Sequence, residues 1–244
     1  MFYYRKILVI SDNPFLISQF NSLMKKFEGI ELSYACSPSN TALLNNTSLS
    51  VKINSINLKT DWEQTVQTHD LVFSLHCKQL FPAPMVSKVK CINVHPGYNP
   101  YNRGWFPQVF SILNNKKAGA TIHEIDKHLD HGAIIAQKEI EIEKSDNSLN
   151  AYEKIQEAEV QLLKENLENI LSNKYKTILP AEEGNINLKK DFNALCEVDL
   201  DKPVTMGEAI DYLRAMTHGN YKNAYFIDKN TGSKIFVAIQ LEKE

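Results

Sequence analysis

Short apolar runs that lack any polar alternation constrain the fold of this chain more than any other feature. Residues 6–11 and 70–75 are each of strand length and are dominated by Ile, Leu, Val and Phe, and residues 89–94 form a third, mainly apolar run of the same length. Strands of this kind are buried on both faces, which happens where helices cover both sides of a parallel sheet. We therefore expect an α/β, Rossmann-like fold with a mostly parallel sheet and right-handed crossovers.

The segments between these runs read as helices and further strands. Asp12 or Asn13 can cap a helix that Pro14 opens and that runs to about Phe27. Asn147 or Ser148 can cap one long helix over residues 146–172, whose apolar stripe indicates core packing. Further strands are expected at 29–34, 51–56, 120–125 and 134–142, and helical segments at 61–68, 105–114 and 205–216.

Two parts of unequal size are expected. Residues 179–187 are rich in turn formers and poor in large apolar side chains, so we place the boundary there. Residues 1–180 would form the catalytic domain, and residues 181–244 a small α+β segment. Strands at 223–227 and 234–241 would make a β-hairpin in that segment.

Composition narrows the possible partners and the compartment. A net charge of −2 and a pI near 6.4 offer no general attraction for nucleic acid. No apolar stretch is long enough for a signal segment or a membrane span. The four cysteines have no CxxC spacing, which fits a reducing environment. A cytoplasmic protein that binds neither nucleic acid nor membrane is the expectation.

Two loops carry the residues that could perform chemistry. Asn93 and His95 stand at the end of an apolar run, before a loop rich in Pro, Gly and Asn, and Asp130 follows in a second loop. Ligands of parallel sheets bind beyond the carboxyl ends of the strands. An amide, an imidazole and a carboxylate suit acyl transfer to an amine, because they can stabilise an oxyanion, move a proton and orient the imidazole. Whether His95 acts as base or as electrostatic stabiliser stays open.

Three histidines near Asp130 are not expected to take part in the chemistry. His123 and His128 superficially suggest a zinc-binding helix, but they lie five positions apart, and the alternation around His123 favours a strand. A metal site is therefore not expected. We interpret His123, His128 and His131 as partly exposed loop residues without a catalytic role, with His131 nearest the site. Trp105 and Phe106 are expected to pack against a helix.

Residues 93–107, which read Asn-Val-His-Pro-Gly-Tyr-Asn-Pro-Tyr-Asn-Arg-Gly-Trp-Phe-Pro, and residues 213–226 resemble the nucleotide-sugar N-formyltransferases among the folate-dependent formyltransferases. The resemblance implies 10-formyltetrahydrofolate as formyl donor and no metal. It implies a dTDP-linked amino-dideoxy sugar as acceptor, with dTDP-4-amino-4,6-dideoxyglucose favoured over the 3-amino isomer. It also implies a homodimer and a product used in a cell-surface polysaccharide such as the O-antigen of lipopolysaccharide.

Side-chain chemistry and, for Tyr221, the same resemblance suggest residues that bind the acceptor. Lys78 and Arg103 could anchor a pyrophosphate, with solvated surface charge as the alternative for each. Asn99 and Asn102 could position sugar hydroxyls or phosphate, and Tyr221 could stack on the nucleobase. Two other functions remain open: a formyltetrahydrofolate hydrolase with water as acceptor, and a nucleotide-sugar binding protein without catalysis.

Overall fold

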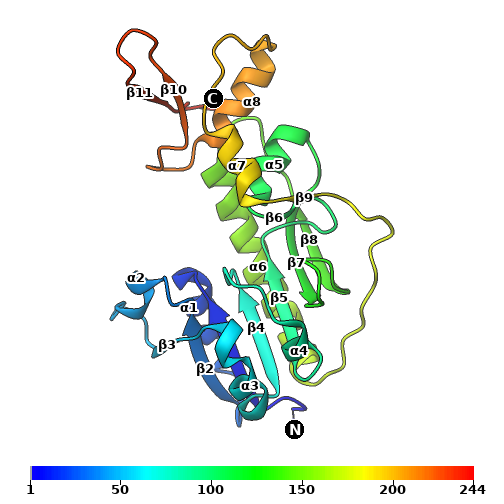
Figure 1. Ribbon diagram of the computed structural model, residues 1–244. Coiled ribbons are helices and arrows are strands. Elements are labelled where there is room, and N and C mark those ends of the chain that lie inside the picture. The colour runs from blue at the N-terminus through cyan, green and yellow to red at the C-terminus, as the bar shows by residue number, and fades with distance from the viewer. Residues whose placement is uncertain (1) are drawn as a thin grey trace.

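The computed structural model describes residues 2–244, and Figure 1 shows one central sheet with helices packed on it. Five strands are parallel, in the order β3 (Ile53–Ser55), β2 (Glu31–Cys36), β1 (Lys6–Ser11), β4 (Leu71–Leu75) and β5 (Lys90–His95). β7 (Ala118–Glu124) pairs antiparallel with β5, and β8 (Ile134–Ile140) pairs antiparallel with β7. The predicted α/β class with a mostly parallel sheet is confirmed.

Helices cover both faces of the sheet, as the apolar runs predict. Along β1, Ile7 and Val9 pack in one cluster, and Leu8 and Ile10 pack in another, because successive strand residues point to opposite faces. The first cluster contains residues of α1 (Pro14–Met24) and α6 (Ser148–Leu171). The second contains residues of α3 (Leu58–Thr68) and α4 (Ala83–Val86). All four residues are less than 5% exposed.

The caps fix where the two helices of the first layer begin. The Asn13 side chain accepts a hydrogen bond from the backbone of Leu16, and Pro14 occupies the first turn. α1 ends at Met24, before the predicted end at Phe27. Asn147 caps α6 and exchanges hydrogen bonds with Asn150 in a capping box, so it caps the helix instead of Ser148.

A smaller apolar cluster joins the C-terminal part to the sheet domain. Val109 and Ile112 of α5 (Pro107–Asn114) pack with Ala215 and Met216 of α8 (Met206–Met216) and with Phe192. The hairpin of β10 (Ala224–Ile227) and β11 (Lys234–Val237) confirms the prediction, although its second strand is shorter than expected. Three short helices, α2 (Thr41–Leu44), α4 and α7 (Lys189–Leu195), were not predicted.

The connector between the two parts is tied back to the sheet domain. After α6 the chain runs along the side of the molecule and returns to it (Figure 1), where β9 (Ile186–Asn187) pairs in parallel with β6 (Arg103–Gly104). The backbone N–H groups of Arg103 and Trp105 donate to the carbonyls of Asn185 and Asn187. The segment expected to separate two domains therefore braces the loop that follows His95.

Candidate active site

The three residues predicted to act together converge at the carboxyl end of β5. Asn93 and His95 are two positions apart, so they lie on the same face of the strand. Asp130 comes from the loop between β7 and β8. Its Oδ1 accepts a hydrogen bond from Asn93 Nδ2 at 3.0 Å, and its Oδ2 lies 3.5 Å from His95 Nδ1.

His95 is buried, and only one of its two ring nitrogens faces Asp130. Burial lowers the pKa of His95 to about 4, although Asp130 partly opposes this shift. The imidazole is therefore neutral near pH 7, with its proton on Nδ1, the nitrogen that faces Asp130. Nε2 then carries a lone pair, and this buried atom has no hydrogen-bond partner. The arrangement leaves a base available for a ligand's N–H or O–H group.

Asp130 is held in place by the loop around it. Burial raises its pKa, but the His95 and His123 imidazoles and the Gly104 N–H outweigh burial and hold the pKa at about 2. The Asn99 side chain donates to the Asp130 carbonyl at 2.8 Å. Asp130 has a left-handed φ of 47°, a conformation that is uncommon outside glycine and that this loop stabilises. The carboxylate is therefore charged and fixed.

His123 is a fourth member of the cluster, and our interpretation of it as a partly exposed loop residue was wrong. It is 1% exposed, lies on β7 directly opposite Asn93, and its Nε2 is 3.2 Å from Asn93 Nδ2. Its Nδ1 faces the Glu124 carbonyl at 2.7 Å, so the proton is on Nδ1, and Nε2 accepts from Asn93. The strand alternation around His123 was the signal, since an antiparallel neighbour of β5 brings it to the same edge.

Asn99, Asn102 and Arg103 lie on the loop after His95, but their polar groups are largely engaged within the protein. Asn99 holds the Asp130 loop through the carbonyl of Asp130. Asn102 is fully buried, and its amide bonds with four side chains, those of Ser111, Asn114, Asn185 and Asn187. Arg103 is 6% exposed and pairs with Glu183 at 2.7 Å, although its Nε has no partner. The structure thus places Asn99 and Asn102 as supports of the loop.

Lys78 and Tyr221 lie outside this cluster. Lys78 lines a cavity of about 360 Å³ beyond the ends of β1 and β4, together with Asn13, His76 and Tyr152. Tyr221 is 73% exposed, and its ring contacts that of His218, which in turn contacts Tyr152. In the register of β4 and β5, Leu75 pairs with Val94, so His76 and His95 are neighbours at the sheet edge. The cavity therefore lies at the same carboxyl edge of the sheet as the cluster, although none of Asn93, His95 and Asp130 lines it.

The remaining residues near Asp130 make local contacts. His131 Nδ1 pairs with Asp126 at 2.9 Å, and its Nε2 lies 3.7 Å from Glu183. Phe106 packs against Phe192 with ring centroids 4.2 Å apart, which confirms the expected packing role. Within residues 2–244, no group of three or more His, Cys, Asp or Glu side chains has a geometry suited to a metal ion.

The comparisons with known proteins agree with this geometry. Residues 23–167 match the model of the formyl transferase family. The dTDP-4-amino-4,6-dideoxyglucose formyltransferase of Mycobacterium tuberculosis is 51% identical over 181 residues, which cover 74% of this chain and 77% of the relative. The chain belongs to the sugar N-formyltransferase family.

Solved structures extend this likeness to nearly the whole chain. A 4-N formyltransferase from Francisella tularensis superposes with a TM-score of 0.95 at 48% identity, over 98% of this chain and 99% of that one. A sugar N-formyltransferase from Shewanella sp FDAARGOS_354 gives a TM-score of 0.92 at 43% identity, over the same shares. Within the present chain, the C-terminal residues 191–243 match the N-formyltransferase dimerization C-terminal domain.

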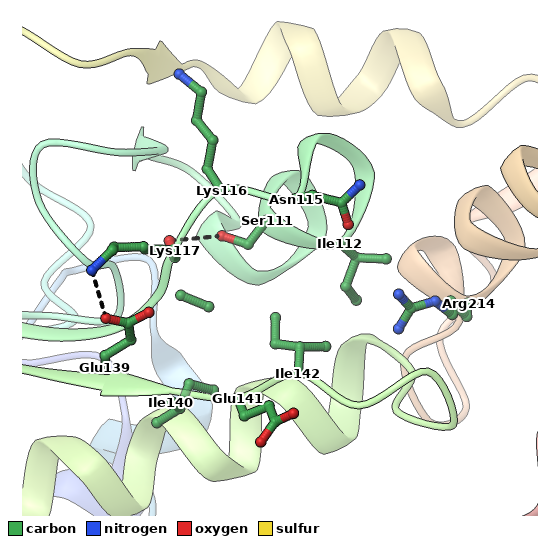
Figure 2. Close-up of a pocket in the computed structure, with 11 residues that line it drawn as sticks. Ser111, Ile112, Asn115, Lys116, Lys117, Glu139, Ile140, Glu141, Ile142 and Arg214 are labelled. Atoms are coloured by element: carbon green, nitrogen blue, oxygen red, sulfur yellow. Dashed lines mark hydrogen bonds and ion pairs between the residues drawn. The ribbon is translucent and has the colours of Figure 1, made fainter.

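A second cavity, of about 490 Å³, lies between α5, β7, β8 and α8 (Figure 2). Its charges are largely paired, since Lys117 binds Glu139 at 2.8 Å. Arg214 lines it, but the guanidinium also binds Asp211 and donates to the carbonyls of Glu143 and Asp146. Arg214 thus joins α8 to the sheet domain. No helix among residues 2–244 is both long and apolar enough to cross a membrane.

Proposed function

We propose that this chain transfers the formyl group of 10-formyltetrahydrofolate to the amine of dTDP-4-amino-4,6-dideoxyglucose. The observation that carries the proposal is the buried, unpartnered Nε2 of His95 beside Asn93 and Asp130, because acyl transfer to an amine needs such a base. The 51% identity to an enzyme named for this acceptor supports the choice of sugar.

In the proposed reaction, the neutral sugar amine attacks the formyl carbon, and the nitrogen loses a proton to His95 Nε2. The C–N bond to the folate then breaks, and the folate nitrogen receives that proton from His95. The negative charge of Asp130, 3.5 Å from Nδ1, stabilises the imidazolium that exists between these two transfers. Of the two roles that the sequence left open for His95, the depressed pKa favours the base.

Asn93 would stabilise the oxyanion, but in this structure both hydrogens of its amide are engaged. One is donated to Asp130 and the other to His123 Nε2. The contact with neutral His123 is longer, at 3.2 Å, and a charged oxygen is a stronger acceptor than an imidazole nitrogen. The developing oxyanion would therefore displace His123 as the acceptor from Asn93, and His123 would orient the amide until that step.

The acceptor would lie in the cavity next to His95, with its diphosphate near Lys78 and its base toward Tyr221. An exposed ammonium offers the diphosphate a point charge, and an exposed aromatic face can stack on a pyrimidine. This position brings the sugar between the nucleotide and the cluster around His95. Arg103 is the weaker candidate for the diphosphate because Glu183 already neutralises it.

The C-terminal domain would make the protein a homodimer. The match to a dimerization domain supports this, as do exposed apolar side chains on α8 and β11, namely Met206, Ile235 and Phe236. A dimer of about twice the 27.8 kDa chain mass is the expected result in light scattering. The sugar product would enter a cell-surface polysaccharide, and the reaction would take place in the cytoplasm.

Mass spectrometry of the reaction tests the function. The protein is mixed with 10-formyltetrahydrofolate and, in separate reactions, with the dTDP-linked 4-amino and 3-amino dideoxyglucoses. Formylation of the 4-amino sugar alone supports the proposal, whereas formylation of the 3-amino isomer alone refutes the assigned position of the amine. A reaction without sugar tests the hydrolase alternative, which predicts folate deformylation in water. Binding of the sugar without folate consumption supports the binding-protein alternative.

A further inference from the structure

A buried contact between a carboxylate and an imidazole, with no assigned role, lies beside the proposed acceptor cavity. Glu159 of α6 is fully buried, and its Oε1 is 2.7 Å from Nε2 of His76, the residue that follows β4. Its Oε2 has no partner. A carboxylate that is held out of water by a single hydrogen bond is costly to a fold. The pair is therefore unlike the surface ion pairs of this chain.

The backbone is bent to make this contact. Along β4, Leu71, Phe73 and Leu75 face α1 and α6, so His76 would face the opposite side if the strand continued. His76 instead has a left-handed φ of 56°, which non-glycine residues seldom adopt. This conformation brings its ring to α6, where Glu159 and Tyr152 bind it. Strain retained at a cavity wall indicates a functional position.

Hydrogen-bond direction around His76 indicates which atoms carry protons. The Oδ1 of Asn13 accepts from the Leu16 backbone, so its amide nitrogen faces His76 Nδ1 at 3.3 Å and the Tyr152 hydroxyl at 3.1 Å. A nitrogen that faces an N–H group carries a lone pair. His76 therefore holds its one proton on Nε2, toward Glu159. The Tyr152 hydroxyl, 3.1 Å from Nδ1, is then a second donor that shares the one lone pair of Nδ1 with Asn13.

Protonation of His76 would reverse the direction of the hydrogen bond between His76 and Tyr152. An Nδ1–H would donate to the Tyr152 oxygen, which also accepts from Asn13, and the hydroxyl hydrogen would be free to point into the cavity. Burial raises the pKa of Tyr152 to about 12, so this hydroxyl stays neutral and remains a donor. The cavity would gain a donor and a positive charge in one step. Both changes favour an anionic ligand.

We propose that Glu159 and His76 form a proton-coupled positioning pair for the diphosphate of the nucleotide sugar, with Tyr152 as the residue that donates to a phosphate oxygen. The proposal rests on the function proposed above. Nucleotide binding would draw one proton from solvent onto His76. Burial raises the pKa of Glu159, which His76 opposes, so a protonated His76 also neutralises an unfavourable buried charge.

Other titratable groups surround His76, and the experiment has to separate them from it. They come from every neighbouring element: Glu159 and Tyr152 from α6, His95 from β5, Asp12 and Lys78 from the two adjoining loops, and His218, which follows α8 and whose ring contacts Tyr152. The Asp12 carboxylate already accepts from Ser37, Asn40 and the Lys78 backbone, so it is stabilised on its own side of the cavity.

Calorimetric titration with dTDP-glucose tests the proposal, because this sugar has no amine and its diphosphate diester does not titrate near neutral pH. Titrations in two buffers of different ionisation enthalpy measure proton uptake. For the unmodified protein we expect affinity to fall as pH rises, with net proton uptake on binding. Glu159→Gln and His76→Gln should bind about tenfold more weakly at pH 7 and take up no proton, with the KM for formyltetrahydrofolate unchanged.

Two further variants separate positioning from folding. Tyr152→Phe keeps the ring and removes the hydroxyl, so it should weaken binding about tenfold and retain proton uptake. His69→Asn alters the histidine at the opposite end of β4 and should change neither quantity. Binding without proton uptake, or full affinity in Glu159→Gln, would overturn the inference and leave the proposed function intact. No binding of dTDP-glucose by the unmodified protein would overturn the proposed substrate class and the inference with it.

Discussion

Gly97 determines where the His95 ring can lie, and the substitution Gly97→Ala tests the proposed base directly. A Cβ at position 97 would be 2.5 Å from His95 Nε2 and 2.8 Å from Cδ2, whereas ordinary van der Waals contact begins near 3.4 Å. The ring nitrogen would have to retreat by 3.4 − 2.5 = 0.9 Å. The φ of Gly97 is not left-handed, so alanine adds a steric contact without backbone strain.

A displacement of this size is large for a proton-transfer group. Misplacement of a reacting group by about 1 Å costs on the order of a hundredfold in rate. We expect Gly97→Ala to lower kcat for formyl transfer by about that factor, with the Kd for dTDP-glucose nearly unchanged. Overpacking would cost about 1–3 kcal/mol of folding stability, which leaves a folded protein at assay temperature.

A double-mutant cycle decides whether the loss passes through His95. In a His95→Ala background the added methyl group has no imidazole to displace, so Gly97→Ala should cause little further loss. Gly207→Ala is the matched control, because a Cβ there would lie 4.0 Å from its nearest neighbour, Thr205 Oγ1. Equal losses in both backgrounds, or full activity of the single variant, would refute the assignment of Nε2 as the reacting atom.

Three other outcomes follow from the same geometry. Asp130→Asn should stay folded and lose about a hundredfold or more in kcat, because the neutral amide no longer stabilises the imidazolium; a native circular dichroism spectrum is the control. With a base at His95 whose pKa is about 4, kcat at saturating sugar should stay level from about pH 8 down to about pH 5, and a kcat that rises on acidification would indicate a protonated His95 instead. Asn102→Ala should cost about 1–3 kcal/mol in urea denaturation, since it removes the hydrogen bonds that a fully buried amide makes with four side chains, of which Ser111 is itself buried; native stability with impaired nucleotide binding would instead indicate that Asn102 contacts the ligand.

Local sequence patterns were sufficient to predict the sheet and most of its helices. The runs at β1, β4 and β5 are apolar because both of their faces are covered, and that property is visible in one strand alone. Caps such as Asn13 and Asn147 are equally local. The pairing of β6 with β9 was not predicted, because two-residue strands have no periodicity and depend on a partner about 80 positions away.

The candidate site shows the same division between local and distant information. The spacing of Asn93 and His95 on one strand is local, and Asp130 was identified from the loop that follows a second predicted strand. His123, Asn102 and the pair of His76 with Glu159 could not be assigned from local patterns. Their roles depend on which residue faces them across the sheet or from α6, and the sequence does not specify that register.

The antiparallel strand β7 explains why four polar side chains gather at one edge. A strand parallel to β5 would need a crossover connection. The loop after such a strand would begin beyond the carboxyl end of β5. β7 instead runs back beside β5, which sets His123 opposite Asn93, and the pairing of β7 with β8 shifts register between Ile122 and His123. Bulges of this kind redirect side chains near active sites. The loop that follows can then fold back over β5, where Gly104 and Asn99 bind Asp130. The reversal of strand direction after β5 therefore permits the contacts among Asn93, His123 and Asp130.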